Sequence, residues 1–351
     1  MSDWCGAPTH GGPDALGVPL HDFSTNSNAC GPCPEAQAAV AGADAARYPD
    51  PAYTALRAAL GRLHGVDAAR VLIAGSASEF IHRATALAVR SGLRAVLLPA
   101  HSYGDYAQAA QAWGLALGRA TEDAGQGPEG EPVLHWACEP ASPLGQEDPA
   151  LRDWGRTPWT AGLRVLDCAY APLRLDAGEG AEGTGGAVRA FALPEPGGAW
   201  QLWSPNKALG LTGVRAAYAI APEGAEDRVQ ALRALAPSWP TGAHGVALLQ
   251  AWAQPSVQQW LARSRPVLGD WKRQQLALCA ELGWPVRPGS LANYFVARPP
   301  VADLAGALQA LRAQGIKLRD CASFGLPGHV RLGVLGPQAQ QALRRAWLAR
   351  P

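Results

Sequence analysis

The chain has 351 residues, of which 48% are hydrophobic, so it can bury a large core in one domain or in two coupled ones. Its 30 basic and 29 acidic residues leave a net charge of +1 and form no basic stripe, which predicts no nucleic-acid partner. The sequence contains no apolar run long enough to span a membrane and no signal-peptide pattern at its start. We therefore expect a cytoplasmic protein without a membrane partner.

The seven cysteines are scattered and odd in number, which favours a reducing compartment over a disulfide framework. Cys30 and Cys33 form a C-x-x-C pattern, which is known from redox and metal sites. No second pair accompanies them, and Pro32 and Pro34 stiffen the segment. We interpret it as a rigid loop and expect no metal site.

Helical and strand-like segments alternate after an extended, Gly- and Pro-rich N-terminal arm, residues 1–35. We predict helices over residues 52–65, 78–90 and 103–114 and strands over residues 70–75, 95–100, 132–138, 163–170, 187–193, 201–205 and 215–221. This alternation predicts an α/β fold with a mainly parallel sheet covered on both faces. The clustering of strands late in this region favours a mixed sheet.

The pattern changes after Pro237, and we expect a large domain over residues 36–240 and a smaller one over 241–351. The second domain is predicted to begin with helical sequence (242–283) and to continue as an α+β unit: strands over 293–298, 316–321 and 329–335, and helices over 302–315 and 337–350. The acidic, Gly-rich stretch 176–186 is expected to be a surface loop.

Polar side chains interrupt two of the strand-like runs. Asp167 and Tyr170 lie three residues apart at the end of the run 163–170. Open α/β sheets bind ligands at the carboxyl ends of their strands. An aspartate at such a place is nevertheless more often a turn former or a helix cap, so the pair alone leaves both interpretations open.

The second interrupted run contains Lys207, with Ser204 three residues before it and Arg215 eight residues after it. A lysine in apolar surroundings loses its proton more readily, and the free amine can attack a carbonyl group. A guanidinium and a hydroxyl are suited to hold one phosphate group. The alternative interpretation is an ordinary surface lysine.

The motifs D-x-A-Y (167–170), S-x-x-K (204–207) and G-x-x-G-x-R (210–215) occur in this order along the chain. On these motifs the chain resembles the class I/II aminotransferases, which are fold-type I enzymes of pyridoxal 5′-phosphate (PLP). The resemblance covers nearly the whole chain. It implies a mostly parallel, seven-stranded type of sheet flanked by helices, with a smaller α+β C-terminal domain that binds the substrate carboxylate.

The resemblance also implies roles for the residues of the two runs. Lys207 would bind the cofactor's aldehyde covalently and then act as the general acid/base. Asp167 would pair with the protonated ring nitrogen, which deepens the electron sink of the cofactor, and Tyr170 would reach the ring hydroxyl. Ser204 and Arg215 would hold the phosphate.

The segment LIAGSASEFIHR (72–83) also matches the family. It runs from a strand through Gly-Ser-Ala-Ser into a helix, and the N–H groups at a helix N-terminus form an anion cradle. We therefore expect Ser76, Ala77 and Ser78 at the PLP phosphate. Taken alone, the pattern is equally that of a serine N-cap.

Two tyrosines are assigned by the same resemblance. Tyr103 in AHSYGDY (100–106) matches the aromatic residue that stacks on the cofactor ring, although a core tyrosine at a helix start fits the pattern too. Tyr48 in ARYPDP (46–51) matches a tyrosine that reaches the phosphate in the partner subunit, which implies a homodimer. On its own that segment indicates only a turn.

One loop departs from the family pattern. Relatives carry N-P-x-N-P-x-G, and the second asparagine hydrogen-bonds the ring hydroxyl. This chain has CEPASPLG (138–145), with Ser142 in that place. A serine hydroxyl can donate or accept but is shorter, so we expect a different environment for the ring. Asn206, beside the lysine, stands where relatives often have Ser or Thr.

Three residues are candidates for binding the substrate. Arg331 in HVRLGV matches the arginine that binds a substrate carboxylate, for which a planar guanidinium is suited. Arg319 in LRDCASFGL is expected on a neighbouring strand, and His10 of the arm is expected to bind a substrate phosphate with it. The alternatives are a surface arginine and a solvated arm histidine.

Two subgroups of the family share these motifs: the histidinol-phosphate aminotransferases and the threonine-phosphate decarboxylases of cobalamin biosynthesis. His-Gly-Gly (10–12), HDFSTNSNACGP (21–32) and LRDCASFGL (318–326) look more like the decarboxylases. We therefore expect a PLP-dependent lyase that decarboxylates L-threonine O-3-phosphate, with a histidinol-phosphate-type aminotransferase as the alternative. A non-catalytic PLP-fold binding protein is a third hypothesis, which Ser142 suggests and the retained lysine and aspartate oppose.

Overall fold

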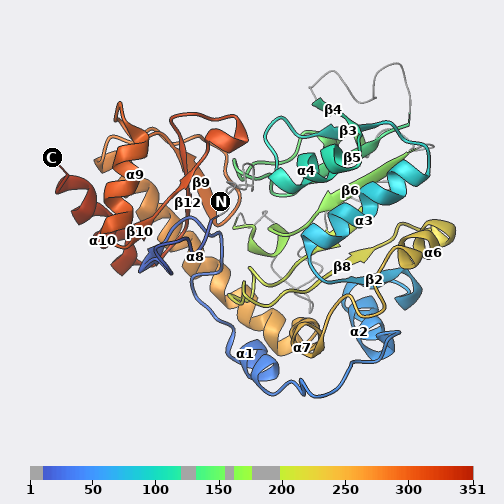
Figure 1. The fold of residues 1–351 in the computed structure, drawn as a ribbon. Coiled ribbons are helices and arrows are strands. Elements are labelled where there is room, and N and C mark those ends of the chain that lie inside the picture. Colours follow the sequence, from blue (N-terminus) through green and yellow to red (C-terminus); the bar gives the residue numbers. More distant parts are fainter. Residues whose placement is uncertain (1–10, 120–131, 155–161, 176–197, 351) are drawn as a thin grey trace.

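The computed structural model describes residues 11–119, 132–154, 162–175 and 198–350 (Figure 1). Within these ranges the largest sheet has seven strands in the order β2-β8-β7-β6-β5-β3-β4. Its strands are β2 (Val71–Ala74), β3 (Ala95–Leu98), β4 (Ala116–Arg119), β5 (Leu134–Cys138), β6 (Leu163–Asp167), β7 (Trp200–Trp203) and β8 (Ala217–Ile220). All pairs from β4 to β7 are parallel, and β8 is antiparallel to both β7 and β2. The prediction of a mainly parallel, mixed sheet is confirmed.

The strands of this sheet are apolar on both faces. Successive side chains of a strand point to opposite sides, so the two faces divide the residues alternately. In β2, Val71 and Ile73 pack into one hydrophobic cluster, while Leu72 and Ala74 pack into another on the opposite face. Continuous apolar strands of this kind require a cover of helices on each side.

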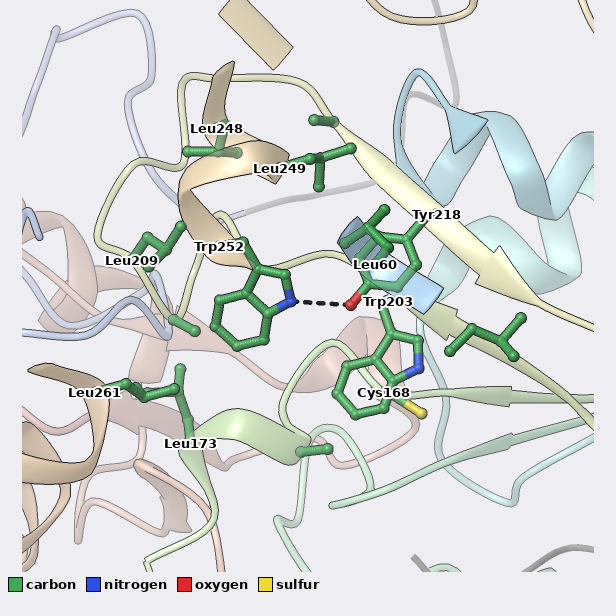
Figure 2. Packing of buried hydrophobic residues seen from close by; sticks show 14 of the residues in the cluster. Leu60, Cys168, Leu173, Trp203, Leu209, Tyr218, Leu248, Leu249, Trp252 and Leu261 are labelled. Atoms are coloured by element: carbon green, nitrogen blue, oxygen red, sulfur yellow. Dashed lines mark hydrogen bonds between the residues drawn. The ribbon is translucent and has the colours of Figure 1, made fainter. Parts of the chain in front are cut away.

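Helices provide that cover (Figure 1). One face packs against α3 (Ala77–Arg90), α4 (Gly104–Ala112) and α6 (Glu226–Ala234). The other packs against α1 (Pro34–Ala41), α2 (Thr54–His64), α7 (Ala243–Trp252) and the first part of α8 (Pro255–Glu281). On that face Trp252 Nε1 donates to Tyr218 Oη at 2.9 Å, which satisfies two polar groups inside the core (Figure 2).

The C-terminal part contains a second sheet, of order β11-β12-β9 and antiparallel throughout. The elements of this C-terminal part are β9 (Tyr294–Ala297), α9 (Leu304–Ala313), β10 (Ile316–Lys317), β11 (Arg319–Asp320), β12 (Val330–Gly333) and α10 (Pro337–Leu348). The single strand predicted over 316–321 is thus two short strands. They separate because β10 pairs with β1 (His21–Asp22) of the arm, whereas β11 pairs with β12.

The sequence did not predict β4, α1, α6 or the short helix α5 (Ala150–Trp154). Strand β4 lies at the edge of the sheet and is mostly exposed, so its residues show no apolar alternation. The predicted strand 187–193 and the predicted loop 176–186 lie outside the described residues. None of the helices in the described ranges is long and apolar enough to cross a membrane.

Helix α8 belongs to two hydrophobic clusters. Leu268 packs with the residues beneath the large sheet, and Leu278 packs with the core of the C-terminal part. We propose that α8 connects two structural units. The boundary at residues 240–241 that the sequence suggests stays a prediction.

The arm is anchored to the body of the protein by Asn28, whose side chain is 2% exposed. Its Nδ2 donates to Ala208 O at 3.0 Å and to Ser264 Oγ at 2.9 Å, while its Oδ1 accepts from Cys30 N at 3.0 Å. The asparagine thereby links the arm both to the turn after β7 and to α8. It lies close to the site because Asn28 N also donates to Lys207 O at 2.9 Å.

We expect Asn28→Ala to lower the free energy of unfolding by about 1–3 kcal/mol, because it leaves buried polar partners without hydrogen bonds. Urea unfolding followed by fluorescence measures the change. Ser27→Ala is the matched control, since Ser27 is only half-buried and its contact to Lys207 O is 3.5 Å long. Equal stability of the two variants would contradict the anchoring role.

Candidate active site

A cavity of about 630 Å³ lies at the carboxyl ends of β2, β6 and β7. Strand β8 is antiparallel to its neighbours, so its start and the preceding Arg215 reach the same edge of the sheet. The cavity is lined by these residues from the sequence prediction: Ser76, Ala77, Ser78, Tyr103, Ser142, Asp167, Tyr170, Ser204, Lys207, Arg215, Arg319 and Arg331. Segments far apart in the sequence therefore meet at one place.

Two predicted residues are not part of this group. Tyr48 is 79% exposed and stacks on Trp239, with the ring centroids 4.5 Å apart. It lies on the surface of its own subunit and does not line the cavity. His10 lies outside the described residues.

Asp167 ends β6 and is 4% exposed. Its burial raises the pKa of the carboxyl group, and hydrogen bonds from Tyr106 Oη at 2.6 Å and from Ala169 N at 2.9 Å act in the opposite direction. The nearby positive charge of Lys207 also lowers this pKa. A desolvated carboxylate of this kind is stabilised most by a cation in contact with it.

Tyr106 is a functional candidate that the sequence reasoning missed. It is fully buried in α4, stacks on Trp136 with centroids 4.7 Å apart, and donates to Asp167. A signal was available, because Tyr106 lies three residues after Tyr103 and so shares its helix face. Tyr103 contacts it edge-on, with centroids 5.8 Å apart.

Lys207 lies in the turn that follows β7, and its Nζ is 5.2 Å from the centroid of the Tyr170 ring. Tyr170 itself is 8% exposed and packs edge-on against Tyr294, with centroids 4.8 Å apart. Its Oη accepts a hydrogen bond from Asn26 Nδ2 of the arm at 3.3 Å. The amine of Lys207 thus lies over the Tyr170 ring, and the residue lines the cavity.

The N-terminus of α3 lines the cavity through Ser76, Ala77 and Ser78. Ser76 Oγ accepts from Glu79 N at 3.0 Å and Glu79 Oε2 accepts from Gly75 N at 3.1 Å, a reciprocal cap. A side chain at Gly75 would approach Pro240 O to 2.5 Å, so the turn needs glycine. The Ser76 hydroxyl accepts in the cap and keeps its own hydrogen, so this hydroxyl and the backbone N–H groups of the first turn are donors for an anion.

The opposite end of the cavity contains two arginines on paired strands. Arg319 and Arg331 are partners in the β11–β12 register and are 5% and 7% exposed. The Arg319 guanidinium lies 4.8 Å and that of Arg331 5.5 Å from the centroid of the Phe324 ring. Burial and the charge of Arg331 both lower the pKa of Arg319. Two neighbouring buried cations favour an anionic ligand.

Ser142 belongs to this arginine end in the structure. Its Oγ accepts from Arg331 Nη1 at 3.1 Å, and Arg331 Nη2 donates to Ser24 O of the arm at 3.1 Å. The serine thus helps to orient a guanidinium. The predicted contact of Ser142 with a cofactor ring stays a prediction.

Comparison with known proteins agrees with this geometry. Residues 157–345 match the family model of aminotransferase class I and II. The histidinol-phosphate aminotransferase of Paracoccus denitrificans is 28% identical over 327 residues, which cover 89% of this chain and 84% of that protein.

Two solved structures share the fold. The histidinol-phosphate aminotransferase of Sinorhizobium meliloti, in complex with pyridoxal-5′-phosphate, has a TM-score of 0.75 and 20% identity, covering 97% of this chain and 94% of that one. The L-threonine-O-3-phosphate decarboxylase of Porphyromonas gingivalis has a TM-score of 0.71 and 19% identity, covering 93% and 98%.

A seven-stranded α/β sheet that brings a lysine, a buried aspartate and a helix N-terminus to one cavity at its carboxyl edge has the arrangement of a PLP-dependent enzyme. The chain belongs to the class I and II aminotransferase family. Its cofactor is PLP, as the resemblance of the motifs implied.

The described side chains fit this cofactor. The desolvated Asp167 needs a cationic partner, which a protonated ring nitrogen provides. The Ser204 hydroxyl is buried at the cavity wall and has no hydrogen-bond partner in the described part of the chain, so a phosphate oxygen would complete its bonding. The helix N-terminus and Arg215 supply further donors for a phosphate.

We expect Tyr106→Phe to weaken PLP binding about tenfold, the loss of one hydrogen bond to a charged group. Without this bond the pKa of Asp167 rises further, so a smaller fraction of the carboxyl group is ionised at neutral pH. The attraction between this carboxylate and the protonated ring nitrogen is then weaker. Absorbance titration of the apoenzyme with PLP measures the affinity. Tyr218→Phe is the matched control, since Tyr218 is equally buried and hydrogen-bonded but packs in the core of Figure 2. Unchanged affinity in Tyr106→Phe would refute the assignment.

Proposed function

We propose that this enzyme acts on a small amine that carries a phosphate group. The observation that carries the proposal is the pair of buried guanidiniums, Arg319 and Arg331, which face the cavity opposite the cofactor's phosphate cradle. Planar forks of N–H donors recognise carboxylate and phosphate oxygens in two-point contacts. Two adjacent cations are suited to a dianion, or to a phosphate together with a carboxylate. His10 of the arm is proposed as a third contact.

We assign the cofactor contacts as the motifs suggest. Asp167 would hold the proton of the ring nitrogen, Tyr170 would donate to the ring oxygen, and Tyr103 would stack on the ring. The phosphate would be bound by Ser204, Arg215 and the N–H groups of Ser76, Ala77 and Ser78. The support is that all of these residues line the same cavity.

Lys207 carries the chemistry in this proposal. When bound, PLP supplies an electron sink for the bond that breaks at the substrate's Cα. Lys207 Nζ would first hold the cofactor covalently and then, once the substrate amine has displaced it, move a proton to or from Cα. Arg319 and Arg331 would bind the anionic group of the substrate. The orientation that they impose would determine which Cα bond is perpendicular to the cofactor ring.

For the reaction itself, the curated relative favours transamination. The histidinol-phosphate aminotransferase of P. denitrificans aligns along 89% of the chain. In this reaction Lys207 would remove the Cα proton of a phosphorylated amine such as histidinol phosphate. The amino group would then pass to 2-oxoglutarate and yield glutamate.

A second candidate is the decarboxylation of L-threonine O-3-phosphate, and a specific observation favours it. The segments that resemble the decarboxylases, at residues 11–12, 21–32 and 318–326, converge at the arginine end of the cavity. Gly11, Ser24 and Phe324 line it there, and Ser24 O accepts from Arg331. A solved threonine-phosphate decarboxylase shares the fold. In this reaction the Cα–carboxylate bond would break and Lys207 would return a proton to Cα.

We further infer a cytoplasmic homodimer, in which Tyr48 reaches the partner's cofactor. The exposed Tyr48 ring, which stacks on Trp239, supports this inference.

The substrate class is tested with phosphorylated and phosphate-free amines. We expect kcat/KM to fall about a hundredfold or more when the phosphate is absent, because contacts with two guanidiniums are lost. Release of glutamate from histidinol phosphate and 2-oxoglutarate identifies the transaminase, whereas release of CO₂ from threonine phosphate without an acceptor identifies the decarboxylase. Equal kcat/KM with and without the phosphate would refute the proposal.

The role of Lys207 is tested by colour. The wild-type enzyme loaded with PLP is expected to show a visible absorbance band, and Lys207→Ala is expected to lose the covalent link and with it the band's wild-type position. Reduction with borohydride should fix the cofactor to the wild-type chain alone, as mass spectrometry would show. Lys272→Ala is the control, because Lys272 is bonded to Ser290 O and Ala292 O outside the cavity lining. Cofactor fixed to Lys207→Ala would contradict the assignment.

A further inference from the structure

Asn26 of the arm is a buried polar residue to which neither the motifs nor the cofactor assignments give a role. Its side chain is 1% exposed and lines the cavity. Its Nδ2 donates to Tyr170 Oη at 3.3 Å, and its Oδ1 has no partner among the described residues. A buried amide oxygen without a hydrogen-bond donor lowers the free energy of unfolding. A residue that destabilises the fold in this way is a candidate for a functional role.

The position of Asn26 is fixed by its neighbours on both sides. Asn293 Nδ2 donates to Asn26 O at 3.3 Å and to Ser27 O at 3.1 Å. Two residues further on, Asn28 N donates to Lys207 O at 2.9 Å. These hydrogen bonds hold the backbone on both sides of Asn26 to the start of β9 and to the turn that contains Lys207.

The hydrogen bond from Asn26 determines where the Tyr170 proton points. Because the amide N–H donates to the phenol oxygen, the phenol's own hydrogen is directed elsewhere and is available to an acceptor in the cavity. A hydroxyl that receives a hydrogen bond is also a stronger donor, since bonds in a chain polarise one another. Asn26 thus prepares Tyr170 to donate to an anionic oxygen.

The loop that could compete for this task contains no amide side chain at residues 138–145. The hydroxyl of Ser142 lies at the arginine end of the cavity, where its Oγ accepts from Arg331 Nη1 at 3.1 Å. We propose that Asn26 is a positioning residue, which acts through Tyr170 on the ring oxygen of PLP. The proposal rests on the cofactor of the family and holds for either reaction.

Other charged or titratable groups also surround Tyr170. Lys207 lies over its ring, Asp167 precedes it on β6, and Tyr294 packs against it from β9. Arg331 on β12 lies over the Tyr294 ring, with 5.5 Å between the guanidinium and the ring centroid. None of these groups replaces the donor that Asn26 provides to Tyr170 Oη.

The test is a pH titration of the visible absorbance of the PLP-loaded enzyme, measured without substrate. In Asn26→Ala we expect the midpoint to rise by about half to one pH unit, the equivalent of one hydrogen bond. The reason is that a poorer donor to the ring oxygen leaves more negative charge on it. The proton that this oxygen shares with the Lys207 nitrogen is then released at higher pH.

Three further variants make the outcome specific. Ser142→Ala should leave the midpoint unchanged, and an equal shift there would assign the role to the loop instead. Tyr170→Phe should raise the midpoint, and adding Asn26→Ala to it should cause no further shift, because Asn26 acts through the phenol. Asn26→Asp keeps the size of the side chain but replaces the donor with an acceptor. Its absorbance midpoint should therefore rise at least as much as that of Asn26→Ala.

Thermal unfolding of each variant shows whether the arm remains folded, and Asn26→Asp keeps the test available if Asn26→Ala does not bind PLP. An unchanged midpoint in both Asn26 variants would overturn the proposal. A full additional shift on top of Tyr170→Phe would overturn it as well, since Asn26 would then act independently of the tyrosine. Because no substrate is used, a failed substrate assignment leaves this result unaffected.

Discussion

Burial of one carboxylate, Asp167, at the end of a strand covered on both faces is the constraint on which the site depends. The helices that cover the sheet remove water from the carboxyl end of β6, and this desolvation raises the pKa of Asp167. Tyr106 and the backbone N–H of Ala169 offset part of the penalty. A cation in contact with the carboxylate compensates the rest of this desolvation penalty. The same burial that forms the core therefore makes the Asp167 site prefer a protonated ring nitrogen.

Much of this arrangement was predictable, because the relevant signals are local. Apolar runs ending in a polar residue predicted β6 and β7, and Gly75 with Ser76 predicted the turn into α3. The carboxyl ends of neighbouring parallel strands meet by topology, so residues from these runs had to converge. The resemblance of the motifs then ordered them around one cofactor, and the class that it implied is confirmed by the family match.

The features that were missed depend on contacts between distant segments. Tyr106 is an ordinary core tyrosine in sequence, and its hydrogen bond to Asp167 exists only after α4 packs on the sheet. Strands β10 and β11 read as one strand, and only the arm's pairing with β10 divides them. Ser142 was interpreted by alignment with a family loop, whereas its hydrogen bond to Arg331 depends on how the C-terminal sheet approaches. Periodicity and motif spacing do not show how segments that are distant in the sequence pack against one another.

The arginine end of the cavity explains why the arm and the C-terminal part must fold together. Arg319 and Arg331 are like charges in a desolvated place, and burial together with the charge of Arg331 lowers the pKa of Arg319. The Phe324 ring, Ser142 and the carbonyl of Ser24 stabilise them through weak or neutral contacts. Arg319 also donates to Asp320 O and to Ser323 Oγ, both at 2.8 Å, and a bound phosphate would add a charged acceptor for both guanidiniums. His101 Nδ1 lies 2.7 Å from Phe324 O and ties this end to the loop after β3. An anionic ligand bound at this place would therefore contact a cluster in which the C-terminal sheet, the arm and the loops after β3 and β5 already meet.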